Sequence, residues 1–232
     1  WEISYICFLL FVERKKKGRR MEIEEISINS KEYPERLKNI YDSPKKLYIL
    51  GNKSLLHRKG VAIVGAREST LYGKNVAYEL AIQLSQSGIV IISGLALGID
   101  TYAHIGALQG GTIAVLGSGI NNIYPKENIE LARRIIKNNG CIISEYPLSS
   151  KPERLHFPQI NRIISGLSEG VIVVEASKKS GALITAEFAL EQGKEVFAVP
   201  GDVRRKQSEG TNQLIKDGAM IVTGYKDILE NI

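Results

Sequence analysis

The sequence predicts an α/β protein with a doubly wound, mostly parallel sheet of about seven or more strands and helices on both faces. From residue 61 onward, short runs of β-branched residues alternate with segments that have the period of a helix. The runs are continuously apolar, which is typical of strands that helices cover on both faces. Alternation of strand and helix favours parallel strands joined by helical crossovers.

Seven apolar runs predict the strands in chain order: VAIVG (61–65), IVIISG (89–94), TIAVLG (112–117), CIISEY (141–146), VIVVEA (171–176), EVFAVPG (195–201) and MIVTG (220–224). Between the first two, Val76, Leu80 and Leu84 share one helical face. Similar amphipathic stretches lie at about 127–138, 181–192 and 211–217. Residues 33–56 predict a short helix and a loop that lead into the first core strand.

The N-terminal segment, residues 1–20, is predicted to be a leader that precedes the native start at Met21. Its apolar run YICFLLFV is too short to span a bilayer, and its basic cluster follows that run. A peripheral anchor or a genuine extra segment is the alternative. The predicted organisation is therefore a leader (1–20), a short N-terminal helix and loop region (21–60) and one large domain (61–232).

Composition excludes several classes of protein. The chain has 232 residues, 44% of them apolar and 24% charged, which is typical of a soluble globular protein. Cys7 and Cys141 are too few for a disulfide framework or a zinc site, so a cytoplasmic location is expected. Residues 1–20 carry six basic and two acidic side chains, so only +2 of the net charge of +6 belongs to the rest. Net charge is therefore weak support for a polyanionic partner.

The predicted carboxyl ends of the strands are where a ligand would bind in a sheet of this kind. Ser93, Gly94 and Gly98 allow a close turn after one strand, and Asp100 stands where it can cap the helix that carries His104. A structural cap and a catalytic pair are both compatible with this pattern. The neighbouring turns GAREST (65–70) and GSG (117–119) favour an anion site built from backbone amides.

Common nucleotide and metal motifs are absent from the sequence. It has no P-loop, no complete dinucleotide fingerprint and no nucleophile elbow. Three scattered histidines do not suggest a metal site, so neither a metal nor a cofactor is expected.

Basic and aromatic residues are interleaved in the predicted strand-end loops. Cations can bind phosphates and rings can stack on unpaired bases, which favours single-stranded nucleic acid. For any one of these residues, a solvated lysine or a ring packed over the core is the competing interpretation. The residues are Arg67, Lys151, Arg154, Arg162, Lys178, Lys179, Arg204, Arg205 and Lys206, with Tyr72, Tyr102, Tyr124, Tyr146 and Phe157.

The segments VAIVGAREST, SGLALGIDTYAHIGAL, TIAVLGSGINNIYP, ISEYP, FPQINRIISGLSEGVIVVEASKKSGALITAEFAL and VFAVPGD through SEGTNQLIKDGA occur in that order. Together they resemble the DNA-processing protein A (DprA/Smf) family from about residue 33 to 224. The resemblance implies an extended Rossmann-like domain that binds and protects single-stranded DNA and forms a homodimer. It also implies a non-enzymatic protein that helps load the RecA recombinase during natural transformation.

The resemblance also implies site residues. Gly65, Arg67, Ser69, Ser93, Gly94 and Gly98 would form a phosphate pocket. Phe157 would touch a base, Arg162 a phosphate, and Asn161, Lys151 and Lys179 would complete the DNA-binding set. The chain departs from the family in having Ile160 where an arginine is usual in the FPxRNR stretch, so one basic contact is missing. A C-terminal winged-helix domain, which many members carry, is expected to be absent.

Two alternatives remain open from the sequence. SGALITAE (180–187) loosely resembles the glycine-rich turn of phosphoribohydrolases, and Glu187 with Asp100 could then act as acid and base. The complete PGGxGTxxE signature is missing from the chain. A scaffold that makes only protein contacts is the other alternative.

Overall fold

The structure is a computed structural model that describes residues 22–232, so the predicted leader lies outside the described residues. The strands are β1 (Glu24–Ser27), β2 (Lys46–Gly51), β3 (Gly60–Val64), β4 (Val90–Ser93), β5 (Thr112–Leu116), β6 (Cys141–Ser144), β7 (Gly170–Val173), β8 (Glu195–Ala198) and β9 (Met220–Ile221). The helices are α2 (Glu35–Lys38), α3 (Leu71–Gln86), α4 (Ile99–Gly106), α5 (Ile129–Lys137), α6 (His156–Leu167), α7 (Gly181–Glu191), α8 (Glu209–Lys216) and α9 (Tyr225–Leu229). None of these helices is long and apolar enough to cross a membrane.

The nine strands form one sheet in the order β1-β2-β6-β5-β4-β3-β7-β8-β9. All strands from β3 onward run parallel, and β1 and β2 add an antiparallel edge. β3 lies between β4 and β7, with Ala62 opposite both Ile92 and Val171. The chain therefore builds the sheet outward from β3 in one direction and returns to continue from its other side. The predicted doubly wound α/β fold is confirmed.

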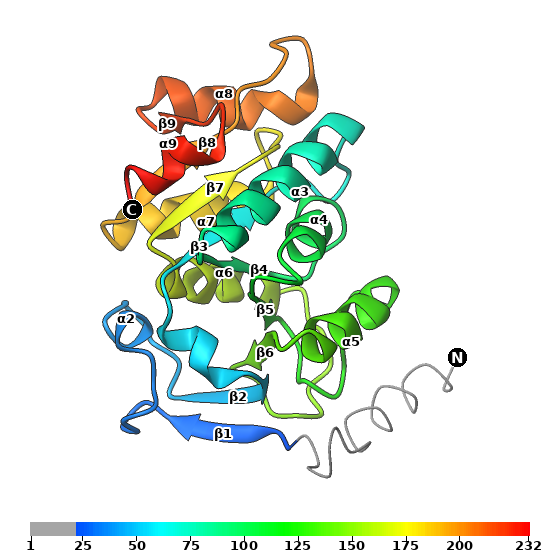
Figure 1. The fold of residues 1–232 in the computed structure, drawn as a ribbon, viewed down its shortest axis with the longest axis vertical. Helices are drawn as coiled ribbons and strands as arrows, with labels where there is room; N and C mark the ends of the chain where they lie inside the picture. The colour runs from blue at the N-terminus through cyan, green and yellow to red at the C-terminus, as the bar shows by residue number, and fades with distance from the viewer. Residues whose placement is uncertain (1–21) are drawn as a thin grey trace.

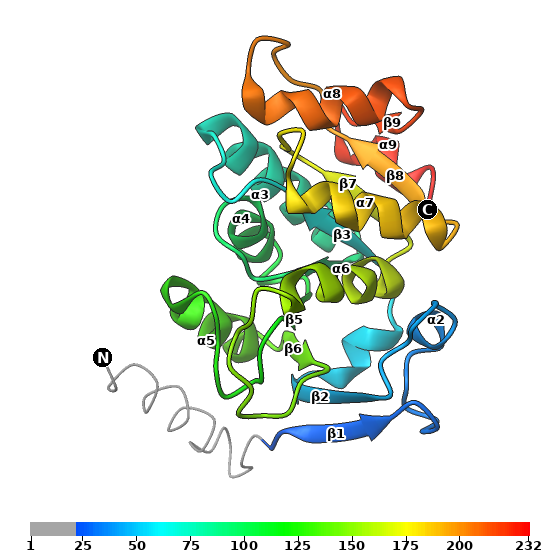
Figure 2. The same cartoon turned by 180° about the vertical axis from the view of Figure 1, so that it is seen from behind.

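Helices cover both faces of the sheet. Figure 1 shows α3, α4, α5 and α9 in front, and Figure 2 shows α6 and α7 on the opposite face. In β3, the side chains of Val61 and Ile63 pack toward α3 and α4, whereas those of Ala62 and Val64 pack toward α6 and α7. All four side chains are buried. The strand runs show no polar alternation because neither face meets water.

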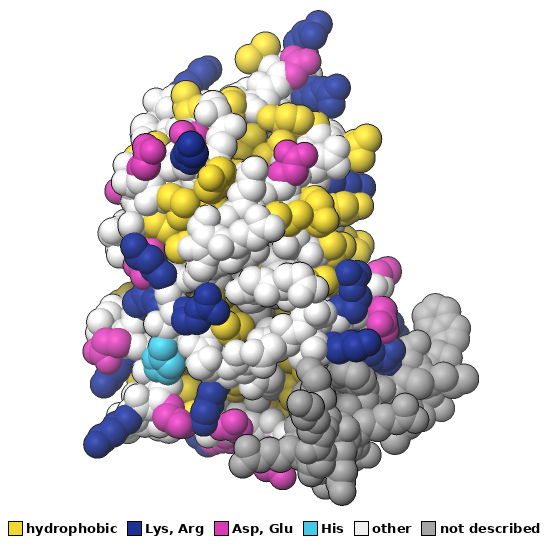
Figure 3. All heavy atoms as spheres, viewed as in Figure 1, with side chains coloured by type: hydrophobic (Ala, Val, Ile, Leu, Met, Phe, Trp, Pro, Cys, Tyr) yellow, Lys and Arg dark blue, Asp and Glu magenta, His cyan; other side chains and the backbone are white. Residues whose placement is uncertain are grey.

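Exposed apolar side chains gather on the face that carries α3 and α9, as Figure 3 shows in the view of Figure 1. At the start of α3, Leu71 and Tyr72 are 72% and 49% exposed. The Tyr72 hydroxyl donates a hydrogen bond to the carbonyl of Pro200, 3.2 Å away. The beginning of α3 is thereby connected to the loop that follows β8.

The expectation of a helix and loop at residues 33–56 is wrong in part. Within this segment α2 is followed by β2, which pairs antiparallel with β6 and places Ile49 opposite Ile143. Leu47, Ile49 and Leu50 of β2 are buried. The short apolar run of β2 follows Pro44, and its pairing with a strand about ninety residues later has no local signal in the sequence. Where the chain divides into domains stays a prediction.

A core substitution in β2 tests whether this edge of the sheet is integral to the fold. We expect Leu47→Ala to lower the free energy of unfolding by about 2–5 kcal/mol, because Leu47 is fully buried. Urea unfolding followed by far-UV circular dichroism measures the change. Lys46→Ala, at the adjacent exposed position, is the control and should have a much smaller effect. Equal midpoints for the two variants would contradict the packing of β2.

Candidate nucleic-acid interface

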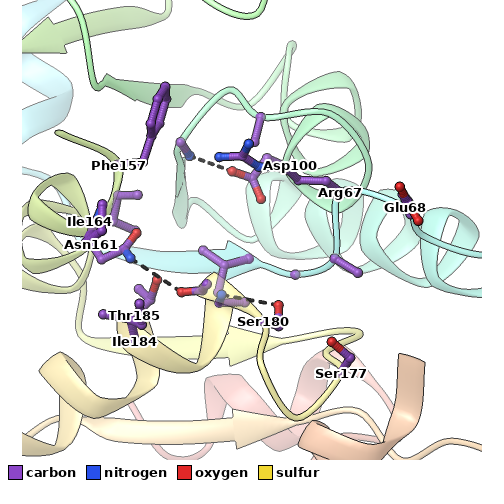
Figure 4. A pocket seen from close by; sticks show the side chains of 18 of the residues that line it. Arg67, Glu68, Asp100, Phe157, Asn161, Ile164, Ser177, Ser180, Ile184 and Thr185 are labelled. Atoms are coloured by element: carbon purple, nitrogen blue, oxygen red, sulfur yellow. Dashed lines mark hydrogen bonds between the residues drawn. The ribbon is translucent and has the colours of Figure 1, made fainter. Parts of the chain in front are cut away.

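A cavity of about 430 Å³ opens at the carboxyl ends of β3, β4 and β7. Its walls come from the loops that follow these strands and from the first turns of α6 and α7, as Figure 4 shows. The order of the sheet reverses between β3 and β7, and the crevice at such a reversal is the usual ligand site of an open parallel sheet. The fold therefore places its main candidate site beside the Arg67 loop.

Arg67 and Phe157 meet at the mouth of this cavity. The central carbon of the Arg67 guanidinium lies 5.2 Å from the centre of the Phe157 ring, which is a cation–π distance. Arg67 is exposed, and its side chain points toward Asp100 and Phe157 in Figure 4. Both residues line the cavity. A cation and a ring are thereby held together where a ligand would enter.

Asp100 lies at the base of the cavity and is only 7% exposed. The expectation that it caps α4 is wrong, because Gly98 is the N-cap residue and Asp100 belongs to the first turn. Its carboxylate instead accepts a hydrogen bond from the Gly94 amide at 3.0 Å. Burial raises the pKa of Asp100 to about 6, although the hydrogen bonds from Gly94 and Ala96 and the charge of Arg67 act against this rise.

Gly65 and Gly98 allow two loops to approach each other closely. Gly98 has a φ of 79°, and a Cβ at this position would collide with the carbonyl oxygens of Ala66 and Arg67. A Cβ at Gly65 would lie 2.6 Å from the Ile99 side chain. The Ile99 amide also donates to the carbonyl of Ala66 at 3.2 Å. These glycines hold the Arg67 loop against the start of α4.

The two predicted serines are not exposed toward the cavity. Ser93 is fully buried, and its hydroxyl donates to the carbonyl of Ile63 at 2.7 Å. The hydroxyl oxygen of Ser69 is buried and has no hydrogen-bond partner within residues 22–232. Neither residue lines the cavity, whereas Gly65, Arg67 and Gly94 do.

The first turn of α7 supplies another wall. Ser180 is the N-cap of α7 and accepts from the Ala182 amide at 3.4 Å. Asn161 of α6 lines the same cavity, and its side-chain amide donates to the carbonyl of Gly181 at 3.4 Å. A helix N-terminus carries a positive partial charge and favours anions. This end of the cavity therefore offers an amide side chain and a helix dipole.

Arg162 is not brought together with Arg67. It is 6% exposed, and its guanidinium forms two hydrogen bonds with the Glu145 carboxylate, at 2.8 and 2.7 Å. Its Nε donates to the carbonyl and the carboxylate of Asp42, at 2.9 and 3.2 Å. Through these hydrogen bonds, Arg162 connects α6 to the end of β6 and to the N-terminal region. Its predicted phosphate contact stays a prediction.

Lys151 and Lys179 are exposed but do not line the cavity. Ile160, at the position where the family usually has arginine, is 4% exposed and belongs to the core. Lys206, one of the interleaved basic residues, lines the cavity, and sequence reasoning did not single out four other side chains that line it: Ser177, Ser180, Thr185 and Gln207. They lie in α7, in the loop before it and in the segment between β8 and α8, and because ligands bind at the carboxyl ends of the strands in an open parallel sheet, these positions could have indicated them.

None of the three histidines lines the cavity. His104 is buried, its Nδ1 lies 2.7 Å from the Thr112 hydroxyl, and burial lowers its pKa to about 3. Asp100 lines the cavity, whereas Glu187 is exposed and does not. Between residues 22 and 232, no cluster of three or more His, Cys, Asp or Glu could hold a metal.

Comparison with known proteins gives a consistent result. The model of the DNA recombination-mediator protein A family matches residues 24–232. The chain is 46% identical over 217 residues to DNA processing protein DprA of Bacillus subtilis, covering 92% of this chain and 73% of that protein. It is also 46% identical over 209 residues to protein Smf of Escherichia coli, covering 89% of this chain and 56% of that protein.

Two solved structures are similar to this chain over about nine-tenths of its length. DNA processing protein A of Streptococcus pneumoniae is 43% identical with a TM-score of 0.86, covering 91% of this chain and 75% of that chain. DNA processing protein A of Helicobacter pylori, whose single-stranded DNA binding mode has been described, is 33% identical with a TM-score of 0.82. That match covers 90% of this chain and 95% of the other. These relatives are named for DNA processing or DNA binding, and none for a catalysed reaction.

The raised pKa of Asp100 predicts a pH dependence of stability. Between about pH 4 and 6 the folded protein keeps a proton on Asp100 that the unfolded chain has lost, so this group makes folding less favourable as pH rises. The effect amounts to about 3 kcal/mol and levels off above about pH 6. As pH rises from about 4 to 6, we therefore expect the free energy of unfolding of Asp100→Asn to increase by about 3 kcal/mol relative to that of the native protein.

Urea unfolding of both proteins at several pH values measures the difference. His104 acts in the opposite direction, because its lowered pKa favours unfolding in acid, but it is present in both proteins. A stability difference that stays constant from pH 4 to 7 would contradict a raised pKa for Asp100.

The buried ion pair of Arg162 predicts the effect of removing it. Arg162→Met leaves the largely buried Glu145 carboxylate without its partner, and we expect the free energy of unfolding to fall by about 3–5 kcal/mol. Combining it with Glu145→Leu removes both charges and should restore much of the loss. If Arg162→Met instead keeps normal stability and only weakens DNA binding, the arginine acts on phosphate.

Proposed function

The chain belongs to the DNA recombination-mediator protein A family, and on this premise we propose that its carboxyl-edge cavity binds single-stranded DNA without catalysing a reaction on it. One observation carries the proposal: the exposed Arg67 cation and the Phe157 ring are held together at the mouth of that cavity. Cations that neutralise phosphates, beside rings that accept bases, are the requirements of sequence-tolerant single-strand binding. The relative from Helicobacter pylori binds single-stranded DNA.

Within this proposal the predicted residues divide into two groups. Arg67, Phe157 and Asn161 would contact the strand, and exposed Lys151 and Lys179 would attract its phosphates from the rim. Gly65, Gly94 and Gly98 would shape the cavity, with buried Ser93 and Arg162 supporting its walls. Ser69 lies two residues after Arg67 in the same loop and would support the conformation of that loop.

We further propose that the protein forms a homodimer and helps load RecA on incoming single-stranded DNA during natural transformation, in the cytoplasm. The family description as a recombination mediator supports this proposal. The chain spans 73% of the length of its relative from Bacillus subtilis and 56% of that of its relative from Escherichia coli. RecA filament assembly on DNA coated with single-strand binding protein, with and without this protein, tests the loading step.

A salt series tests the DNA site. We expect tight binding to oligothymidine and weaker binding to duplex of equal length, with log affinity falling linearly as log salt rises. Arg67→Ala should weaken binding to every sequence alike and reduce the slope by about 0.7, the share of one neutralised phosphate on a single strand. Fluorescence anisotropy with labelled oligonucleotides gives both quantities.

The matched control is Arg58→Ala. Arg58 is also an exposed arginine, and its side chain donates to the carbonyl of Gly88 just before β4, at the opposite edge of the sheet. This variant should keep the affinity and slope of the native protein. Equal losses in the two variants would mean that the cavity is not the binding site.

A further inference from the structure

Tyr124 presents a ring beside the Phe157 ring, in the loop that follows β5. The two ring centres lie 5.6 Å apart with their planes tilted by 51°. Tyr124 is 41% exposed. The sheet order places β5, β4 and β3 side by side, so this loop is next along the edge on the side of the cavity away from β7.

The Phe157 ring is already partly covered. The Arg67 guanidinium lies over it, and the ring also packs against Gly117, where a Cβ would stand 3.2 Å from a ring carbon. A base that stacked on the face under Arg67 would have to displace that cation. Tyr124 has no such cover from Arg67 and remains accessible from solvent, so it is the more available ring at this rim.

The loop that carries Tyr124 is firmly held. Ile123 and Pro125, its two neighbours, are buried. The Asn121 amide donates to the carbonyl of Leu148 at 3.0 Å, and the side chain of Asn122 donates to the carbonyl of Ser149 at 2.7 Å. A loop held in place before binding loses little conformational entropy when a ligand stacks on a ring that it carries.

We propose that Tyr124 stacks on a DNA base and gives the site a second aromatic platform on the β5 side of Arg67. The inference rests on the proposed function and extends it. The strand would then cross the carboxyl edge of the sheet from the β5 loop to the β7 loop, with a base on Tyr124 and a phosphate near Arg67. Tyr78 is exposed to a similar extent, 39%, but it lies in the middle of α3 and makes no ring contact with Phe157 in the described part of the chain, so it serves as the matched control.

The test compares oligothymidine with an abasic oligonucleotide of equal length, which keeps the phosphates and lacks the bases. We expect Tyr124→Ala to weaken oligothymidine binding by about 5- to 150-fold, the effect of losing one stacked base. Tyr124→Phe retains the ring and should bind like the native protein. On the abasic strand, Tyr124→Ala and the native protein should bind equally. Tyr78→Ala should be neutral on both strands, whereas Arg67→Ala should weaken both.

Two results would contradict the proposal that Tyr124 stacks on a base. One is native-like binding of oligothymidine by Tyr124→Ala, and the other is an equal loss on both strands, which would indicate an effect on the loop. Unfolding midpoints of the variants separate a lost contact from a damaged fold. A different result would contradict the proposed function itself: the native protein would then bind neither strand, and Arg67→Ala would change nothing.

Discussion

The parallel pairing of β3 with both β4 and β7 is the constraint on which the rest of the structure depends. It forces the chain to leave β3 in one direction and to return after β6 on the other side. Two loops that are more than one hundred residues apart in the chain, 65–70 and 174–180, therefore meet at one edge. The backbone records this meeting directly, because the Ala66 amide donates to the carbonyl of Glu175 at 2.7 Å.

This meeting also explains the glycines and the buried carboxylates around the cavity. Glu175 accepts hydrogen bonds from the amide and hydroxyl of Thr70, which is the N-cap of α3. The Asp100 carboxylate likewise accepts a hydrogen bond from the Gly94 amide. From the sequence, the backbone amides of these turns were expected to bind a phosphate. Two of them, those of Thr70 and Gly94, instead donate to carboxylates of the protein itself. What remains for a ligand is the exposed Arg67, the start of α7 and the aromatic rim.

The main sheet could be predicted from the sequence because each of its parallel strands carries its own signal. Every strand from β3 onward is a local apolar run, and burial on both faces produces that pattern without any knowledge of the partner. β2 was missed because its role depends on its pairing with β6. Arg162 could be singled out from the sequence, but its burial and its partners could not be predicted, since Asp42 lies 120 residues away in the chain. The same holds for Asp100, whose carboxylate turns back to Gly94.

At its C-terminal side the sheet ends in β9, which contains only two residues. An edge strand of ordinary length exposes a ladder of unpaired amides and carbonyls and invites another chain to extend the sheet. Here that ladder is too short to hold a neighbouring strand in register. Self-association of this protein through continuous β-structure at the β9 edge is therefore disfavoured.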